Sequence, residues 1–392
     1  MKNITRSMLC LVATVYIVNL VSAQTVKPLN WGTQHVLSSK ILNEDRELMV
    51  VLPEGYEKSK HHYPVLLMTD ARQNIRHTMG ATDVLSRTGD APPVIIVGLV
   101  SKNRMLDFTP TQDKSNPENK SGGGEKLLQF IKQELLPYIE SKYRTHPFRI
   151  LAGHSLGGLF TGYVLLQHPH LFDAHIVISP SFWWNKEEMV AKAKTFFQQQ
   201  THLNKTVYFG IGTLDGYGMR QELKRYVETI KQNHPKGFRF RHQEFEGEGH
   251  MSAPLLVTYQ GLKFIFSDMT FPKSLVNNYS NQAFDKHQKN LLKKYGSSMK
   301  QTGEAYFDLA YALVKVENWD GAAYVFQQGI KAYPRSIWMM DYLGRVYIKA
   351  NKIDKAIATY EKAIKVSEKY GQGKIKFFKE KIAKLRKKKT NK

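Results

Sequence analysis

Residues 148–159 read Phe-Arg-Ile-Leu-Ala-Gly-His-Ser-Leu-Gly-Gly-Leu, and this stretch constrains the fold more than any other part of the chain. An apolar run at 150–152 ends in Gly-x-Ser-x-Gly, and a helix-compatible stretch at 159–166 follows at once. Small residues two positions before and after Ser155 let a strand and a helix pass close together, with the serine in strained backbone geometry. This strand–turn–helix pattern is typical of a nucleophile elbow. The alternative is a glycine-rich turn without chemistry.

Strands and helices alternate on both sides of this turn. Alternating polar and apolar residues at 30–55 predict a hairpin, and residues 101–124 read as a long loop. Further strands are predicted at 63–70, 93–100, 174–179, 206–212 and 238–245, and helices at 124–142, 186–199, 219–233 and 252–267. This order predicts an α/β-hydrolase fold with a mostly parallel central sheet over residues 24–268.

A 34-residue period follows a connector at 269–302. The marked positions of a helical repeat begin with Tyr306, Leu309 and Ala310, and after a shift of 34 they fall on Met340, Leu343 and Gly344. Residues 303–370 therefore resemble two tetratricopeptide repeats, which form a small C-terminal all-α helical-repeat domain. Two repeats are few for independent stability, so we expect them to pack on the α/β domain. A closing helix is expected over 366–386.

The N-terminus reads as a secretory signal over residues 1–23. Lys2 and Arg6 precede an apolar stretch from Met8 to Val21, and small residues precede a cleavage position before Gln24. Cys10 is the single cysteine and lies inside this segment, so the mature chain would have no disulfide. These features predict export to the periplasm or the medium of a bacterial cell, with no transmembrane span in the mature chain.

About half of the formal charge of +23 lies at the two chain ends. Residues 371–392 are expected to form a basic helix and tail, in which 374–392 hold ten Lys/Arg and one Glu. Such a tail can attract nucleic acid or an anionic membrane, although a solvated helix end is the preferred interpretation and no specific nucleic acid is expected.

A serine hydroxyl needs a base within hydrogen-bond reach and a carboxylate that orients the base. His250 lies in a glycine-rich loop after a strand and before the last helix, where the base is expected. Asp215 follows the strand at 206–212 and precedes His250, which matches the position of the acid. Glu222 and Glu248 are rivals for this third position.

The oxyanion of the reaction needs two backbone N–H donors. Leu156, the residue after the nucleophile, is one candidate. The second is expected in the loop after the strand at 63–70, at Ala71 or Arg72.

Two clusters are expected to shape a substrate pocket, one in the long loop with Arg104 and Asp107, and one at 179–184 with the two tryptophans. Arg104 could bind an anionic or carbonyl-rich substrate, or pair with Asp107. Trp183 and Trp184, at a strand end, could stack on an aromatic or sugar-like group or serve as core aromatics. His154 is expected to pack beside the site.

The chain resembles the putative-esterase branch of the α/β-hydrolases, which includes esterase D, feruloyl-type esterases and enterobactin siderophore esterases. The resemblance covers about residues 30–267 and depends on the ordered blocks at 63–70, 103–110, 134–140, 153–158, 179–184 and 247–250. It implies Ser155 as nucleophile and His250 as base. It leaves Asp215 open, because some siderophore esterases of this branch work with a serine–histidine pair. The family usually has Asp-Gly where this chain has Asp70-Ala71, and the methyl group could narrow the oxyanion loop.

The sequence thus predicts an exported serine esterase that forms an acyl-enzyme and requires no metal or cofactor. Its substrate would be a small ester of a siderophore, a feruloyl group or an acylated sugar. The alternative is an inactive hydrolase fold whose repeats bind a protein partner.

Overall fold

The computed structural model describes residues 31–216, 218–297 and 299–390. The predicted signal segment, with Cys10, lies outside these residues. Within the described ranges, no helix combines the length and the apolar character needed to cross a bilayer.

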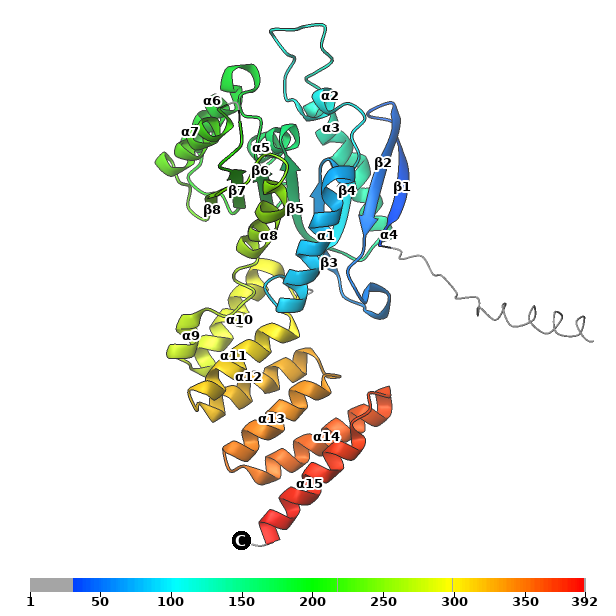
Figure 1. The fold of residues 1–392 in the computed structure, drawn as a ribbon, viewed down its shortest axis with the longest axis vertical. Helices are drawn as coiled ribbons and strands as arrows, with labels where there is room; N and C mark the ends of the chain where they lie inside the picture. The colour runs from blue at the N-terminus through cyan, green and yellow to red at the C-terminus, as the bar shows by residue number, and fades with distance from the viewer. Residues whose placement is uncertain (1–30, 217, 298, 391–392) are drawn as a thin grey trace, which may run out of the picture. The chain divides into compact units, whose positions relative to one another are not determined.

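Eight strands form one sheet in the order β1-β2-β4-β3-β5-β6-β7-β8 (Figure 1). The strands β3 to β8 run parallel, whereas β2 is antiparallel to both β1 and β4. Their bounds are β1 Thr33–Ser39, β2 Glu44–Val51, β3 Tyr63–Met68, β4 Ile95–Leu99, β5 Thr145–His154, β6 Ala174–Ile178, β7 Thr206–Gly212 and β8 Arg239–Phe245. The predicted mostly parallel α/β sheet is confirmed.

Side chains alternate between two buried faces along each central strand. Val65 and Leu67 of β3 contact one apolar cluster, and Leu66 and Met68 contact the other. All six residues of β3 are buried, as expected for a strand covered on both sides.

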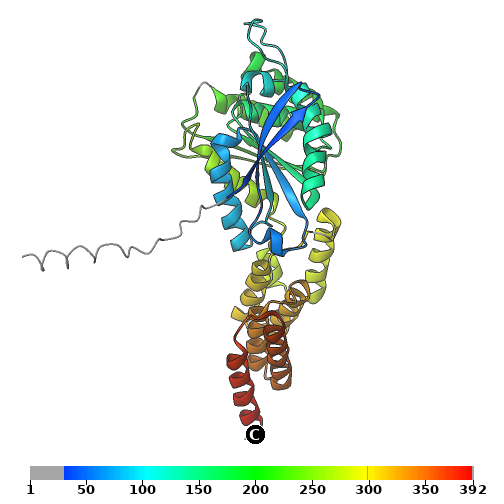
Figure 2. The same cartoon turned by 90° about the vertical axis from the view of Figure 1, so that its right-hand side faces the viewer.

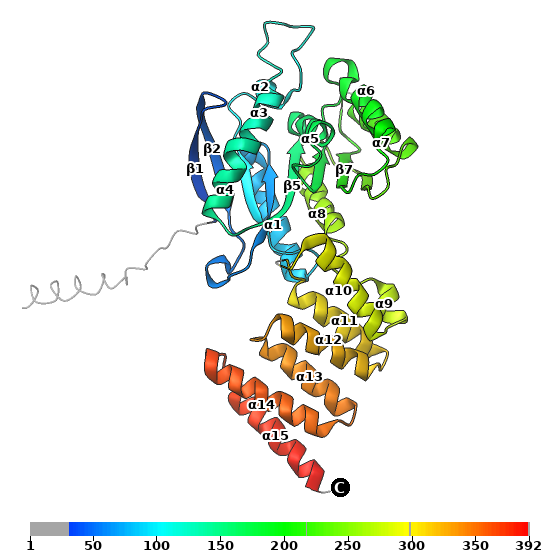
Figure 3. The ribbon, with the colours of Figure 1, turned by 180° about the vertical axis from the view of Figure 1, so that it is seen from behind.

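Helices cover both faces of the sheet, which lies between α1 and the α3–α4 pair in Figure 2. The helices α1 (Ala71–Thr88) and α8 (Ala253–Ile265) cover one face. The other face is covered by α2 (Arg104–Phe108), α3 (Gly124–Phe130), α4 (Leu136–Lys142), α5 (Leu156–Gln167), α6 (Trp184–Gln199) and α7 (Met219–Gln232), several of which are in front in Figure 3.

Two details depart from the expected elements. The helix predicted over 124–142 contains a π-helical turn, η2 (Ile131–Leu135), just before Pro137, which has no N–H for the helical ladder. The predicted loop 101–124 includes the short helix α2, whose first turn is capped by the Asn103 side chain.

The segment 269–302 packs on the α/β domain and also connects it to the repeats. It contains α9 (Lys273–Asn277) and α10 (Asn281–Tyr295), and Leu291 and Tyr295 of α10 join the apolar cluster beneath α1 and α8. The Tyr295 carbonyl accepts a hydrogen bond of 2.7 Å from His146 Nε2, near the start of β5.

Four helices form the two repeats: α11 (Gly303–Lys315), α12 (Trp319–Ala332), α13 (Ile337–Lys349) and α14 (Ile353–Tyr370). The last helix, α15 (Ile375–Thr390), buries Phe378, Ile382 and Leu385 on the repeat core. The expected closing helix over 366–386 is therefore misplaced, because α14 continues to Tyr370 and ends at Gly371 in a left-handed conformation. The basic C-terminus is an amphipathic helix that closes the repeat stack.

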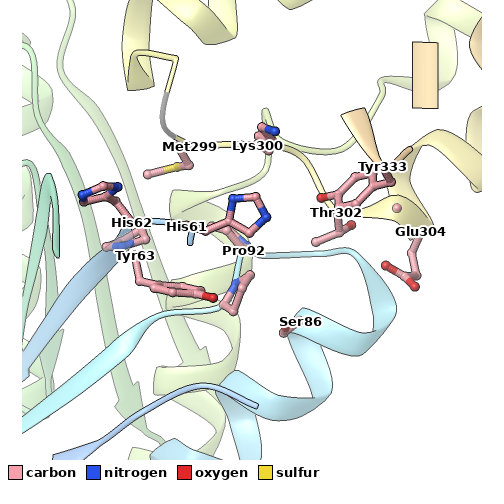
Figure 4. A pocket seen from close by; sticks show the side chains of 13 residues that line it. His61, His62, Tyr63, Ser86, Pro92, Met299, Lys300, Thr302, Glu304 and Tyr333 are labelled. Carbon is pink, nitrogen blue, oxygen red and sulfur yellow. The ribbon is translucent and has the colours of Figure 1, made fainter. Parts of the chain in front are cut away.

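The α/β domain and the repeats belong to one compact unit, Thr33–Lys392. Between them lies a pocket of about 220 Å³, lined by His61, His62 and Tyr63 on one side and by Lys300, Thr302, Glu304 and Tyr333 on the other (Figure 4).

Candidate active site

Ser155 stands at the turn between β5 and α5 with φ 62° and ψ −118°. A non-glycine residue at positive φ costs free energy and persists only where the surroundings enforce it. The neighbouring glycines show how this happens: a Cβ at Gly153 would lie 2.1 Å from the Gly157 carbonyl oxygen, and a Cβ at Gly157 would lie 2.0 Å from Thr69 Oγ1. The predicted elbow geometry is present.

His250 and Asp215 meet at the same edge of the sheet, after β8 and β7. His250 Nδ1–H donates to Asp215 Oδ1 at 2.6 Å, and the Asp215 side chain is fully buried. Burial raises the pKa of Asp215, but hydrogen bonds from His250, Ser179 and the Gly212 N–H outweigh that effect and hold the pKa below its usual range. The carboxylate is therefore ionised at neutral pH.

Backbone hydrogen bonds join the two loops that carry these side chains. The N–H of Thr213 donates to Phe245 O at 3.0 Å, and the N–H of Leu214 donates to Glu248 O at 2.9 Å. Among the described residues, neither Glu222 nor Glu248 bonds to His250, so Asp215 is the carboxylate that the fold brings to it.

The Ser155 hydroxyl has a different neighbour. Its Oγ lies 3.5 Å from Ser181 Oγ. Among the described residues, no hydrogen bond joins His250 to Ser155. The His250 ring instead lies against the ring of His154, with the centroids 4.4 Å apart and the planes tilted by 42°. The hydrogen bond between a catalytic base and its nucleophile is often long in structures without substrate, and it shortens when substrate binds.

The two proposed oxyanion donors begin two helices at the same edge. Leu156 is the first residue of α5, Ala71 is the first residue of α1, and the strands before them, β5 and β3, are hydrogen-bonded neighbours. The first N–H groups of a helix have no acceptor within it. The Ala71 methyl group packs on β4, where a Cβ at Gly98 would lie 2.6 Å from it. Gly98 therefore makes room for the Ala71 methyl group.

Arg104 pairs with Asp70 and not with Asp107, which corrects one of the two alternatives for this residue. Arg104 Nε donates to Asp70 Oδ1 at 2.7 Å, and the side chain remains partly exposed. Asp70 itself has φ 54° immediately before Ala71. Arg104 thus holds the side chain of Asp70, the residue directly before the proposed oxyanion donor Ala71.

Asp107 is buried in the core, away from any position that could contact a substrate. Arg46 donates two hydrogen bonds of 2.6 Å to its carboxylate, and Ser101 Oγ donates a third at 2.7 Å. Both charged side chains are only 3% exposed. The geometry assigns Asp107 to the fold instead of the substrate contact expected from the sequence.

The remaining predicted pocket residues differ in exposure. Trp183 is 42% exposed, but Trp184 is 2% exposed and its Nε1–H donates to Thr111 Oγ1. Trp184 is thus a core aromatic. His154 is buried, and burial lowers its pKa to about 3, with help from His250 and Arg104. His154 is therefore neutral and packs beside the site, without a surface that a substrate could reach.

The sequence indicated Ser179 only as part of a segment beside the pocket, but its hydroxyl donates to Asp215 Oδ2 at 2.6 Å. The signal for this contact lies in the strand order, which places the end of β6 between the ends of β5 and β7. Across the described ranges, no three or more His, Cys, Asp or Glu side chains are grouped as they would be to hold a metal ion.

A family model described as "Putative esterase" matches residues 39–253. The chain belongs to the putative esterase family. It is a carboxylic-ester hydrolase, and both the resemblance and the activity class predicted from the sequence are confirmed. A tetratricopeptide repeat model also matches residues 304–336 and 339–366, which confirms the repeats.

Named relatives support this assignment. The esterase is 30% identical over 226 residues to the ferri-bacillibactin esterase BesA of Bacillus subtilis, covering 52% of this chain and 78% of BesA. It is 27% identical over 212 residues to the siderophore triacetylfusarinine C esterase of Aspergillus fumigatus, covering 46% and 73%.

Solved structures share the fold. An IroE-like serine hydrolase from Shewanella oneidensis has a TM-score of 0.63 at 26% identity, over 73% of this chain and 94% of that one. An uncharacterised protein from Capnocytophaga ochracea has a TM-score of 0.64 at 16% identity, over 91% and 99%. The second likeness concerns the fold alone.

Proposed function

We propose that this esterase is an exported serine hydrolase that cleaves a carboxylic ester of a siderophore through an acyl-enzyme at Ser155. The observation that carries the proposal is the 2.6 Å hydrogen bond from His250 to the buried Asp215, at the sheet edge where Ser155 occupies a strained elbow. The substrate class rests on the names of the relatives, and export rests on the N-terminal segment of the sequence.

In the proposed mechanism, the hydrogen bond to Asp215 keeps the His250 proton on Nδ1 and leaves Nε2 free to accept. Nε2 takes the Ser155 hydroxyl proton while Oγ attacks the ester carbonyl carbon. The N–H groups of Leu156 and Ala71 bind the oxyanion of the tetrahedral intermediate. His250 then returns the proton to the leaving alcohol, and the acyl group remains on Ser155.

The second half of the cycle repeats these roles with water. His250 Nε2 accepts a water proton, the hydroxyl attacks the acyl carbon, and collapse releases the acid and restores the Ser155 hydroxyl. Each proton removed is given back, so the proposed cycle uses only ester and water.

Exposed apolar side chains flank the proposed catalytic residues. Leu214 precedes Asp215 and is 69% exposed, and Met251 follows His250 and is 66% exposed. With the exposed Trp183, they offer apolar and aromatic surface to a siderophore ester.

The test uses purified protein with ferri-bacillibactin, triacetylfusarinine C, feruloyl esters and acetylated sugars, and follows acid release by mass spectrometry. We expect turnover of a siderophore ester and its loss in Ser155→Ala, together with loss of fluorophosphonate labelling. Full turnover by Ser155→Ala would contradict the mechanism. Turnover of feruloyl or acetyl esters alone would contradict the substrate class.

A further inference from the structure

Ser179 occupies an unusual backbone position at the end of β6. Its φ is 40°, its side chain is fully buried, and its N–H donates to Gly210 O at 2.8 Å. Positive φ favours glycine or asparagine, so a serine here carries a conformational cost. Strained non-glycine residues cluster at functional sites, where the surrounding structure holds them in place.

The Ser179 side chain acts on one oxygen of Asp215. Its hydroxyl donates to Oδ2 at 2.6 Å, and the Gly212 N–H donates to the same oxygen at 3.1 Å. The other oxygen, Oδ1, accepts from His250. The carboxyl torsion of an aspartate is broad, so an unrestrained carboxylate rotates easily. Two donors on Oδ2 hold Oδ1 toward the imidazole.

Residues 179–181 also contact Ser155. After Pro180, whose ring restricts the backbone, the N–H of Ser181 donates to Ser155 O at 3.0 Å. Residues 179–181 therefore contact both the proposed acid and the proposed nucleophile.

We propose that Ser179 is a positioning residue, whose hydroxyl fixes the Asp215 carboxylate so that His250 presents Nε2 to Ser155. This inference rests on the proposed function. Ser179 has no exposed surface, so it acts through Asp215 and contacts no substrate.

The test measures kcat and KM on a short-chain p-nitrophenyl ester. Ser179→Ala should lower kcat by about 10- to 100-fold, the effect of losing one hydrogen bond to a charged group, and leave KM within about twofold. In an Asp215→Ala background the same substitution should change kcat by less than about twofold, because there is no carboxylate left to position. Equal losses in both backgrounds, or wild-type kcat in Ser179→Ala, would overturn the proposal.

Two further variants separate the hydroxyl from the backbone and from general destabilisation. Ser179→Gly relieves the positive φ, so recovery of wild-type kcat by this variant would show that conformation matters and the hydroxyl does not. Ser101→Ala removes a matched hydroxyl–carboxylate bond, 2.7 Å to Asp107 in the core, and should keep kcat. A loss of kcat in Ser101→Ala as large as in Ser179→Ala would overturn the specific role.

A spectroscopic readout and a separate control complete the design. The far-downfield proton resonance of the His250–Asp215 hydrogen bond should shift or broaden in Ser179→Ala, and an unchanged resonance would argue against positioning. Ser155→Ala is assayed in parallel: if it retains turnover, the proposed function fails, whatever Ser179→Ala does.

Discussion

Replacing Asp215 with asparagine tests whether the acid is essential, a question that the sequence left open. The side chains have nearly the same shape, so the outcome depends on which way the amide points. The Gly212 N–H lies 3.1 Å from Oδ2 and can only donate. The amide oxygen must therefore take the Oδ2 position, and its NH₂ group must face His250 Nδ1.

This orientation forces the wrong tautomer on the imidazole. With the NH₂ group of the introduced amide as donor, Nδ1 becomes the acceptor and the ring proton moves to Nε2, which can no longer take the Ser155 proton. The corresponding change in serine proteases lowers kcat by about 10⁴-fold. We expect a loss of the same order for Asp215→Asn, with KM nearly unchanged.

The assay is p-nitrophenyl ester hydrolysis at neutral pH, with Ser155→Ala as baseline and thermal unfolding as a check on folding. Asp215→Ala is the comparison, because it removes the carboxylate without imposing a tautomer. Asp215→Asn should be at least as impaired as Asp215→Ala. If a folded Asp215→Asn protein keeps more than about a tenth of wild-type kcat, the esterase works with a serine–histidine pair and our reasoning is refuted.

Three further predictions concern other parts of the structure. Arg46→Met leaves the Asp107 carboxylate buried without its charge partner and should cost about 3–5 kcal/mol of unfolding free energy in urea titration; a loss below about 1 kcal/mol would contradict the buried pair. Gly98→Ala places a methyl group 2.6 Å from the Ala71 Cβ and should lower kcat. Adding Ala71→Gly to the same chain should restore kcat. If kcat is not restored, this contact is not the cause of the loss. Burial lowers the His175 pKa from 6.5 to about 3, so the unfolded chain binds the extra proton and stability falls as the pH drops through this window. The wild type should therefore lose about 2 kcal/mol more than His175→Leu between about pH 7 and pH 5, and equal losses would contradict the assignment.

The sheet and the elbow could be predicted because their signals are local. The residues of β3 are apolar without a break, since both faces of that strand are covered. At Gly153 and Gly157 an added Cβ atom would lie about 2 Å from a neighbouring oxygen, so no other residue fits at these positions. Asp215 and His250 followed from chain order, because parallel strands bring their carboxyl ends to one edge.

Side-chain pairing could not be predicted, because it depends on distances that the sequence does not contain. Asp107 was the nearby partner for Arg104 along the chain, but the fold gives it Arg46, 61 residues away on β2. Trp183 and Trp184 are adjacent, yet one is exposed and the other buried, and nothing in their spacing along the chain indicates which. The role of Ser179 depends on the neighbours of β6, which only the strand order defines.

The contact between α10 and the start of β5 has a consequence for how the repeats relate to catalysis. His146 meets Tyr295 near one end of this strand, and Ser155 follows its other end. At about 3.3 Å per residue, the two positions are on the order of 30 Å apart. A protein bound to the repeats would therefore lie toward the end of β5 opposite Ser155, where it would not cover the proposed active site. We therefore expect a partner that binds the repeats to leave esterase turnover unchanged.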